Sequence, residues 1–111
     1  MSAHTYFPHY WTVLRIEYPS ETVYRLLGSW SGSYLDGSSW RLNSGIKKVC
    51  VSGTDHLDFI GDSGSIYRCH KNSYGVHVES LGVLEKFLSS PNLKVEQLPE
   101  STDWLNKDWT I

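Results

Sequence analysis

The residues best suited to chemistry lie in one segment rich in glycine and serine, residues 28–45. Three of them have large aromatic rings, which gain from burial or from stacking on a ligand, and three have groups that form hydrogen bonds. The candidate binding residues of this segment are Trp30, Tyr34, Asp36, Trp40, Arg41 and Asn43. Aromatic rings beside an arginine, on a backbone of turn-forming residues, are typical of the centre of a protein interface. The same groups suit a sugar or a nucleotide, and the opposite alternative is that Trp30 and Trp40 cover a small core.

A second segment, residues 61–64, reads Gly-Asp-Ser-Gly and resembles the nucleophile segment of trypsin-like serine proteases. The resemblance implies a catalytic triad, for which the chain order offers His9, Asp36 and Ser63. The chain is too short for the double-barrel architecture, and Ser65 replaces the glycine that follows in the motif. Together with the residues before it, the segment also resembles the first block of GDSL-type hydrolases, but no Asp-x-x-His follows. We interpret it as a hairpin turn, and a serine hydrolase built on Ser63 stays as an alternative.

Histidine and cysteine side chains offer the ligands of a metal site. The available set is His56, Cys69, His70 and His77, with Asp55 and Asp58 close in the sequence. Cys69 and His70 are adjacent, and adjacent side chains on a strand point to opposite faces, so the two cannot share one ion without distortion. The sequence therefore predicts no metal site and no cofactor.

Composition and charge limit the classes of function. The chain has 111 residues, which is one domain by length, and its formal net charge is −2. This near-balance argues against a nucleic-acid partner, because such binders usually present a basic face. No segment resembles a signal peptide or a membrane span, so we expect a cytoplasmic protein without a membrane partner. Cys50 and Cys69 are expected to be reduced, buried thiols, with a disulfide between them as the alternative.

The spacing of apolar residues predicts several strands and one helix. Strands are expected over residues 10–18, 22–30, 46–51, 56–60, 65–70 and 93–98, with hairpins joining the first two and the fourth to the fifth. Apolar residues at Leu81, Leu84 and Leu88 predict the helix. Ser80 is its candidate N-cap, and Pro91 follows its end. The expected fold class is therefore α+β, a mostly antiparallel sheet of five or six strands with one helix packed on one face.

Three smaller features complete the sequence-based picture. Residues 103–109 include two tryptophans and are expected to dock onto the domain. The run 31–34 is similar to the run 63–67, and although this is too short for a repeat, we add Tyr67 to the candidate binding residues. An antiparallel sheet of this size has exposed edges, through which a homodimer could form.

Two runs, residues 33–46 and 63–75, resemble segments of small phage-encoded proteins that belong to no characterised family. The resemblance implies a phage accessory protein acting in the cytoplasm of a bacterial host. It assigns no functional residue. By analogy, a compact domain of this kind without a catalytic constellation acts as an inhibitor or decoy for a host protein.

The sequence predicts a small non-enzymatic binding protein that inhibits a host protein, such as a defence factor, through residues 28–45. The main alternative is a module that sequesters a carbohydrate or nucleotide by stacking it on Trp30, Tyr34 and Trp40. The expected partner is a host protein, with a small molecule or a second copy of the chain as alternatives.

Overall fold

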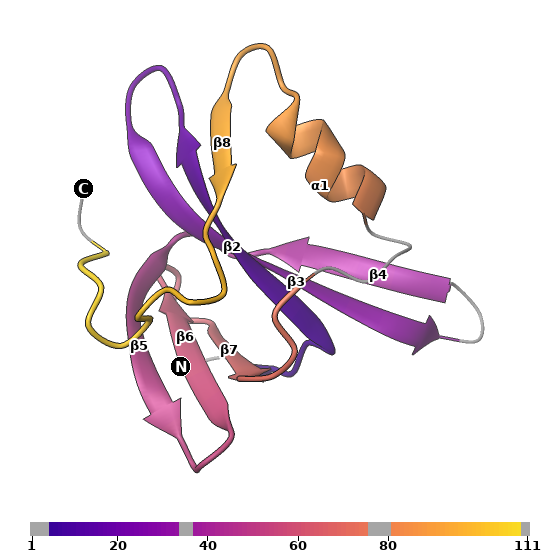
Figure 1. The fold of residues 1–111 in the computed structure, drawn as a ribbon, viewed down its shortest axis with the longest axis vertical. Helices are drawn as coiled ribbons and strands as arrows, with labels where there is room; N and C mark the ends of the chain where they lie inside the picture. Colours follow the sequence, from indigo (N-terminus) through magenta and orange to yellow (C-terminus); the bar gives the residue numbers. More distant parts are fainter. Residues whose placement is uncertain (1–4, 34–36, 76–80, 110–111) are drawn as a thin grey trace.

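A computed structural model of the chain describes residues 5–33, 37–75 and 81–109, which form two four-stranded sheets and one helix (Figure 1). The elements are β1 (Thr5–Tyr6), β2 (Tyr10–Glu17), β3 (Thr22–Ser33), β4 (Gly37–Leu42), β5 (Ile46–Ser52), β6 (His56–Gly61), β7 (Ile66–His70), α1 (Leu81–Leu88) and β8 (Lys94–Gln97). One sheet has the order β1-β7-β6-β5 and the other the order β4-β3-β2-β8. The α+β class is confirmed, but the prediction of a single sheet of five or six strands is wrong.

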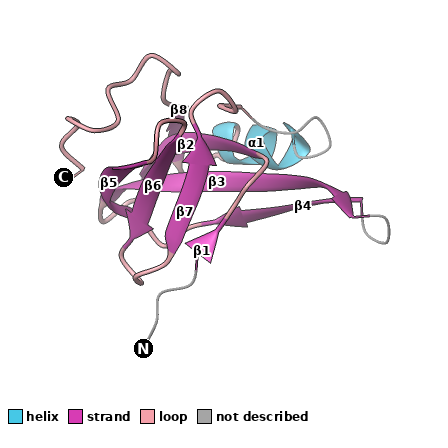
Figure 2. Cartoon of the chain, turned by 90° about the horizontal axis from the view of Figure 1, so that it is seen from below, coloured by secondary structure: helices cyan, strands magenta, loops and turns pink. Residues whose placement is uncertain are grey.

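The chain makes two sheets because the β2–β3 hairpin is apolar on both faces. Trp11 and Val13 lie on one face, and Leu14 and Ile16 lie on the other, and all four are fully buried. Each face therefore needs its own cover. Strands β5, β6 and β7 cover one face, and α1 lies on the opposite side (Figure 2).

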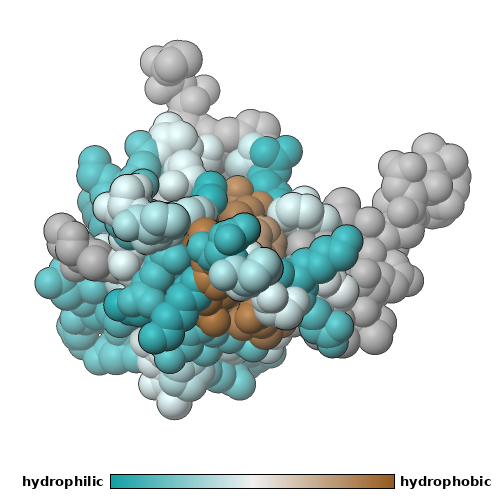
Figure 3. Space-filling model, turned by 90° about the horizontal axis from the view of Figure 1, so that it is seen from above, coloured by the Kyte–Doolittle hydropathy of each residue, from teal (hydrophilic) through white to brown (hydrophobic). Residues whose placement is uncertain are grey.

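Two apolar cores fill the layers. The larger core lies between the sheets, and its buried residues include Trp11, Leu26, Phe59 and Tyr67. The smaller core lies under the helix and consists of Leu14, Ile16, Leu27 and Leu84, with half-buried side chains around them. From the side of α1 and β8, the surface shows an apolar area rimmed by hydrophilic residues (Figure 3).

Pairing within the sheets follows the predicted hairpins and adds two strands that the sequence did not reveal. Strands β2 and β3 pair antiparallel along their length, and β6 pairs antiparallel with β7. Strand β4 lies within the glycine- and serine-rich segment and pairs antiparallel with β3. Strand β1 pairs with β7 in parallel, with Tyr6 opposite Tyr67.

The helix α1 rests on the sheet through a narrow contact. Leu84 is buried, Phe87 is half-buried, and Leu88 is 42% exposed. Leu88, one of the apolar residues whose spacing predicts the helix, therefore lies outside the core. Ser80, the expected N-cap, lies outside the described residues. In the described part of the chain, no helix has the length and apolar character needed to cross a membrane.

The C-terminal segment docks onto the domain, as the sequence predicts. Trp104 is buried, with its ring 5.3 Å from that of Trp11 and 5.9 Å from that of Phe59. Trp109 meets the ring of Tyr24 edge-on at 5.2 Å. These aromatic contacts close the open end of the larger core.

Cys50 and Cys69 are both free thiols, so the alternative of a disulfide between them is wrong. They lie on β5 and β7 with β6 in between, which places them about 9.5 Å apart across two strand spacings, beyond the reach of a disulfide. They also face opposite sides of the sheet, since Cys50 pairs with Asp58 and Cys69 with Leu57. Cys69 is buried as expected, and burial raises the pKa of its thiol, whereas Cys50 is only half-buried.

Candidate binding site

Part of the predicted recognition segment lines a shallow depression beside the edge strand β4. Tyr6, Trp30, Trp40 and Arg41 enclose about 260 Å³, and we call this the aromatic depression. It joins the two sheets, because Tyr6 comes from β1 and the other three residues come from β3 and β4. Tyr34 and Asp36, which were predicted to share this surface, lie outside the described residues.

Trp40 is the more exposed of the two tryptophans, Trp30 and Trp40, for which the sequence proposed either a core or a binding role. Its exposed fraction is 46%, and its ring meets that of Phe87 edge-on at 6.3 Å. On the helix side of β4 it forms a wall of a second concavity of about 450 Å³, together with Lys86, Phe87, Ser90 and Leu93, which we call the Trp40–Phe87 groove. Trp40 therefore separates two concave surfaces.

Arg41 lies next to Trp40 but points to the other face of β4. Trp40 pairs with Ser29 and Arg41 with Gly28, and neighbouring strand residues face opposite ways. The Arg41 guanidinium lies 4.7 Å from the centre of the Tyr6 ring. This is cation–π geometry, and it holds the charge at the rim of the aromatic depression.

Trp30 is half-buried and fastens the N-terminal segment to the sheet. Its indole Nε1 donates a hydrogen bond of 2.9 Å to the carbonyl oxygen of Phe7, and its ring is 6.3 Å from that of Tyr6. Part of its role is therefore structural. The rest of the ring faces the aromatic depression.

Beyond Arg41 the depression continues into a polar cleft of about 250 Å³, which we call the arginine cleft. Its walls include Arg25, Arg41, Asn43, Ser44, Ser63 and Tyr67, and it shares Tyr6 and Arg41 with the aromatic depression. The β4–β5 connection and the β6–β7 turn bring these residues together. The predicted residues Arg41, Asn43 and Tyr67 thus share one cavity.

Asn43 is a buried side chain, only 3% exposed, that shapes the β4–β5 connection. Its Oδ1 accepts hydrogen bonds from the amide of Leu26 at 2.8 Å and the amide of Gly45 at 3.2 Å. Gly45 has a φ of 139°, a conformation that favours glycine. The Nδ2 of Asn43 is buried and finds no hydrogen-bond partner among the described residues.

Arg25 was not predicted as a site residue, and the structure fixes its position. Its Nε donates to the carbonyl oxygen of Asn43 at 2.8 Å, and its Nη1 donates to the hydroxyl of Tyr18 at 2.9 Å. The guanidinium is therefore held at the wall of the cleft by groups from two other segments.

The segment 61–64 is a hairpin turn between β6 and β7, as interpreted from the sequence. The amide of Gly64 donates to the carbonyl oxygen of Gly61 at 3.0 Å. Ser44 Oγ donates to Ser63 Oγ at 3.2 Å and accepts from the Ser63 amide at 3.0 Å, and Ser63 Oγ donates to Ser65 Oγ at 3.4 Å. The partners shown for Ser63 are therefore the neutral hydroxyls of Ser44 and Ser65, neither of which is a general base.

The proposed metal ligands divide as expected. Cys69 faces the core, whereas His70 faces the other side, where its ring is 5.0 Å from that of His56. His70 Nδ1 accepts a hydrogen bond from the amide of Asn72 at 3.1 Å. His77 lies outside the described residues, and among those described no three potential ligands come together.

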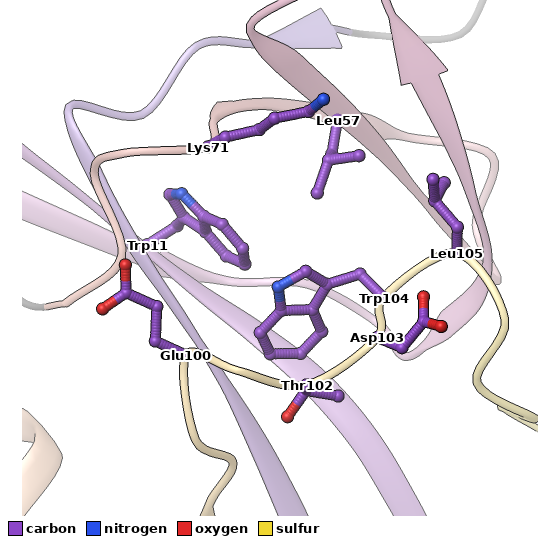
Figure 4. Close-up of a pocket in the computed structure, with 8 residues that line it drawn as sticks. All are labelled: Trp11, Leu57, Lys71, Glu100, Thr102, Asp103, Trp104 and Leu105. Carbon is purple, nitrogen blue, oxygen red and sulfur yellow. The ribbon is translucent and has the colours of Figure 1, made fainter.

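A further pocket, of about 280 Å³, lies where the C-terminal segment crosses the core (Figure 4). The indoles of Trp11 and Trp104 form its floor, with Lys71, Glu100 and Asp103 around the opening. The Nε1 of Trp11 donates to the carbonyl oxygen of His70 at 2.7 Å. Its apolar walls Trp11, Leu57 and Trp104 are core residues, and the other lining residues come mostly from the C-terminal segment, so we assign this pocket to the docking of that segment.

The state of Tyr67 gives a prediction in alkaline solution. Burial raises the pKa of Tyr67 to about 12, and the nearby Arg41 opposes this shift. Because the folded state holds the proton more tightly than the unfolded state, whose tyrosine pKa is about 10, Tyr67 contributes stability below about pH 10 that is lost as the pH rises to about 12. The free energy of unfolding, measured with urea between about pH 10 and pH 12, should decline with rising pH, and the decline should be smaller in Tyr67→Phe. An equal decline in both proteins would contradict the prediction.

The structure adds Tyr6, Arg25, Ser44 and Phe87 to the site, and none of these four residues was a candidate binding residue from the sequence. No family model, curated protein or solved structure matches this chain.

Proposed function

We propose that this chain is a non-enzymatic binding protein that recognises another protein through Trp40 and the concave surfaces on either side of it. The observation that carries the proposal is the exposure of Trp40, at 46%, on an edge strand between the aromatic depression and the Trp40–Phe87 groove. A tryptophan has more contact area than any other side chain, so its burial in a complex is strongly favourable.

The surroundings of Trp40 have the composition of an interface centre. Phe87 and Leu93 supply apolar area in the groove, Lys86 supplies charge there, and Arg41 supplies charge at the aromatic depression on the other side of Trp40. Tryptophan and arginine are the residue types most enriched among those that dominate binding energy. A protein partner suits this arrangement, because the two concavities face different sides of β4 and a large surface can cover both.

The more specific proposal is that the partner is a host protein and that binding inhibits it. Its support is the resemblance of residues 33–46 and 63–75 to small phage-encoded proteins, together with the analogy to compact inhibitors of host factors. Under this more specific proposal, the complex with the host protein assembles in the cytoplasm of a bacterium.

Capture experiments with matched variants test the proposal. The double variant Trp40→Ala/Arg41→Ala is expected to weaken binding by at least about thirtyfold, since even one residue of this type contributes about 2 kcal/mol at an interface centre. Val51→Ala is the control, because Val51 is 54% exposed and lies on β5, outside the concave surfaces beside Trp40. Partners captured from a bacterial lysate by the wild type and the control, but lost with the double variant, are then purified and their affinity measured.

Two results would contradict the proposal. The first is capture of the same proteins by the wild type, the control and the double variant. The second is unfolding of the double variant by circular dichroism, which would make Trp40 and Arg41 residues of the core.

A further inference from the structure

The arginine cleft collects hydrogen-bond donors for which the described structure offers no acceptor. The Arg41 guanidinium stacks on Tyr6, but it makes no hydrogen bond or ion pair to a described residue. The Tyr67 hydroxyl, on the opposite wall, makes none to the described residues either. Asn43 adds a buried Nδ2 group that is equally unsatisfied within the described chain. Arg41 is exposed, whereas the Asn43 Nδ2 is buried, and a buried donor without an acceptor is uncommon in proteins and needs an explanation.

The second arginine of the cleft is held rigidly. Two hydrogen bonds, to the carbonyl oxygen of Asn43 and the hydroxyl of Tyr18, use the Nε and Nη1 groups of Arg25. Its Nη2 has no acceptor among the described residues. A guanidinium that is already fixed loses little conformational freedom when it binds a ligand, which favours affinity.

Hydroxyl groups form the third wall of the cleft. The hydrogen bonds that join Ser44, Ser63 and Ser65 make a short chain at the β6–β7 turn. The proton of Ser65 Oγ, at the end of this chain, is not used within the described structure. The cleft thus presents neutral donors beside its two cations.

The charge of the cleft is one-sided. Arg25 and Arg41 both line it, and no described lining residue has a carboxylate. Asp62, in the adjacent turn, has its Oδ2 directed against Gly45. Burial raises the pKa of Tyr67, and the nearby positive charges of Arg41 and Arg25 oppose this shift. Two guanidinium groups with free N–H groups suit an oxyanion, above all phosphate.

The adjoining aromatic depression indicates which chemical group the bound oxyanion carries. It shares Tyr6 and Arg41 with the cleft and continues to the ring of Trp30. We propose that the arginine cleft binds the phosphate of a small aromatic phosphate monoester, whose ring lies in the aromatic depression. This proposal does not rest on a protein partner, because the purified protein and the ester alone test it.

Isothermal titration calorimetry at low ionic strength is the test, with phenyl phosphate, inorganic phosphate, benzoate and phenol as probes. We expect phenyl phosphate to bind with a Kd on the order of 0.1–1 mM, more tightly than the other three. Arg41→Ala should weaken its binding about tenfold or more, and Tyr67→Phe by a few-fold, because they remove donors to a charged group. Lys94→Ala is the control, since it also removes a positive charge. Lys94 lies on β8, and its side chain is 83% exposed.

We also expect phenyl phosphate to change the amide chemical shifts of residues 41–45 and 63–67 in the wild type. In Arg41→Ala, addition of phenyl phosphate should leave these chemical shifts unchanged. No binding of phenyl phosphate, or equal weakening by Arg41→Ala and Lys94→Ala, would overturn the proposal. Benzoate binding as tightly as phenyl phosphate would overturn the preference for phosphate. Equal affinity for inorganic phosphate would overturn the placement of the ring.

Discussion

Replacement of Trp11 by alanine is expected to lower the free energy of unfolding by about 4 kcal/mol, the largest effect of any substitution proposed for this chain. Trp11 is fully buried, and its ring lies within 5.3 Å of the rings of Phe59, Tyr74 and Trp104. The substitution also removes the hydrogen bond to the carbonyl oxygen of His70. For a small domain, this is a large share of the total stability, and urea denaturation at 25 °C measures it.

A matched tryptophan provides the control for this result. Trp40→Ala makes the same chemical change at a site that is 46% exposed, so it should lower stability by no more than about 1 kcal/mol. Trp11→Phe keeps an aromatic ring and should lie between the two. A smaller loss for Trp11→Ala than for Trp40→Ala would contradict the assignment of Trp11 to the centre of the larger core.

Asn43→Ala is the second substitution with a large expected effect, a loss of about 3 kcal/mol. It removes the Oδ1 that accepts hydrogen bonds from the amides of Leu26 and Gly45, and it leaves both donors without that acceptor in a buried place. Each unsatisfied buried group costs about 1–3 kcal/mol. The measurement is again urea denaturation, with hydrogen exchange at the two amides as a local readout.

Two further variants separate the role of Asn43 as an acceptor from the general effect of replacing an asparagine. Asn43→Asp keeps the accepting oxygen and replaces an Nδ2 group that has no described partner, so at acidic pH, where the buried carboxyl is neutral, its loss should be smaller than that of Asn43→Ala. Asn92→Ala, at an exposed position, should change stability by no more than about 0.5 kcal/mol. Equal losses for Asn43→Ala and Asn92→Ala would refute the buried-acceptor role.

The local elements of the fold were predictable because their signals are local. Alternation of apolar and polar residues identified the β6–β7 hairpin, in which Leu57 and Phe59 face the core and Asp58 faces away from it. On the neighbouring strand, Arg68 forms a bidentate ion pair with Asp58, with Nε–Oδ1 and Nη2–Oδ2 distances of 2.8 and 3.0 Å. This pair helps to fix the register of the hairpin.

The division into two sheets was not predicted, although its cause is visible in β2. Trp11 and Val13 alternate with Leu14 and Ile16, so the run is apolar on both faces. Such a strand must be packed against other elements on both faces, but the pattern of apolar residues does not indicate which elements these are. Strand β4 was missed for a different reason, because its glycine and serine residues have low strand propensity and tertiary pairing with β3 overrides it.

The candidate site was predictable mainly where it is contiguous in sequence, and Tyr67 is the one predicted residue outside that segment. Trp40 and Arg41 stood out by residue type, and the structure places both on concave surfaces. Tyr6 and Arg25 join them through strand pairing and loop contacts over longer sequence separations. Their residue types are ordinary, so only the three-dimensional structure could identify them.

The arrangement of the tryptophans gives the molecule two separate optical reporters. Trp104 and Trp109 are nearly parallel, at 5° and 6.3 Å, and Trp11 lies 5.3 Å from Trp104, so excitation of these three indoles is shared among them. Detachment of the C-terminal segment would abolish the resulting exciton couplet in the ultraviolet circular dichroism spectrum. Trp30 and Trp40 lie elsewhere, at the aromatic depression, and their emission wavelength would respond to an occupant of that surface instead.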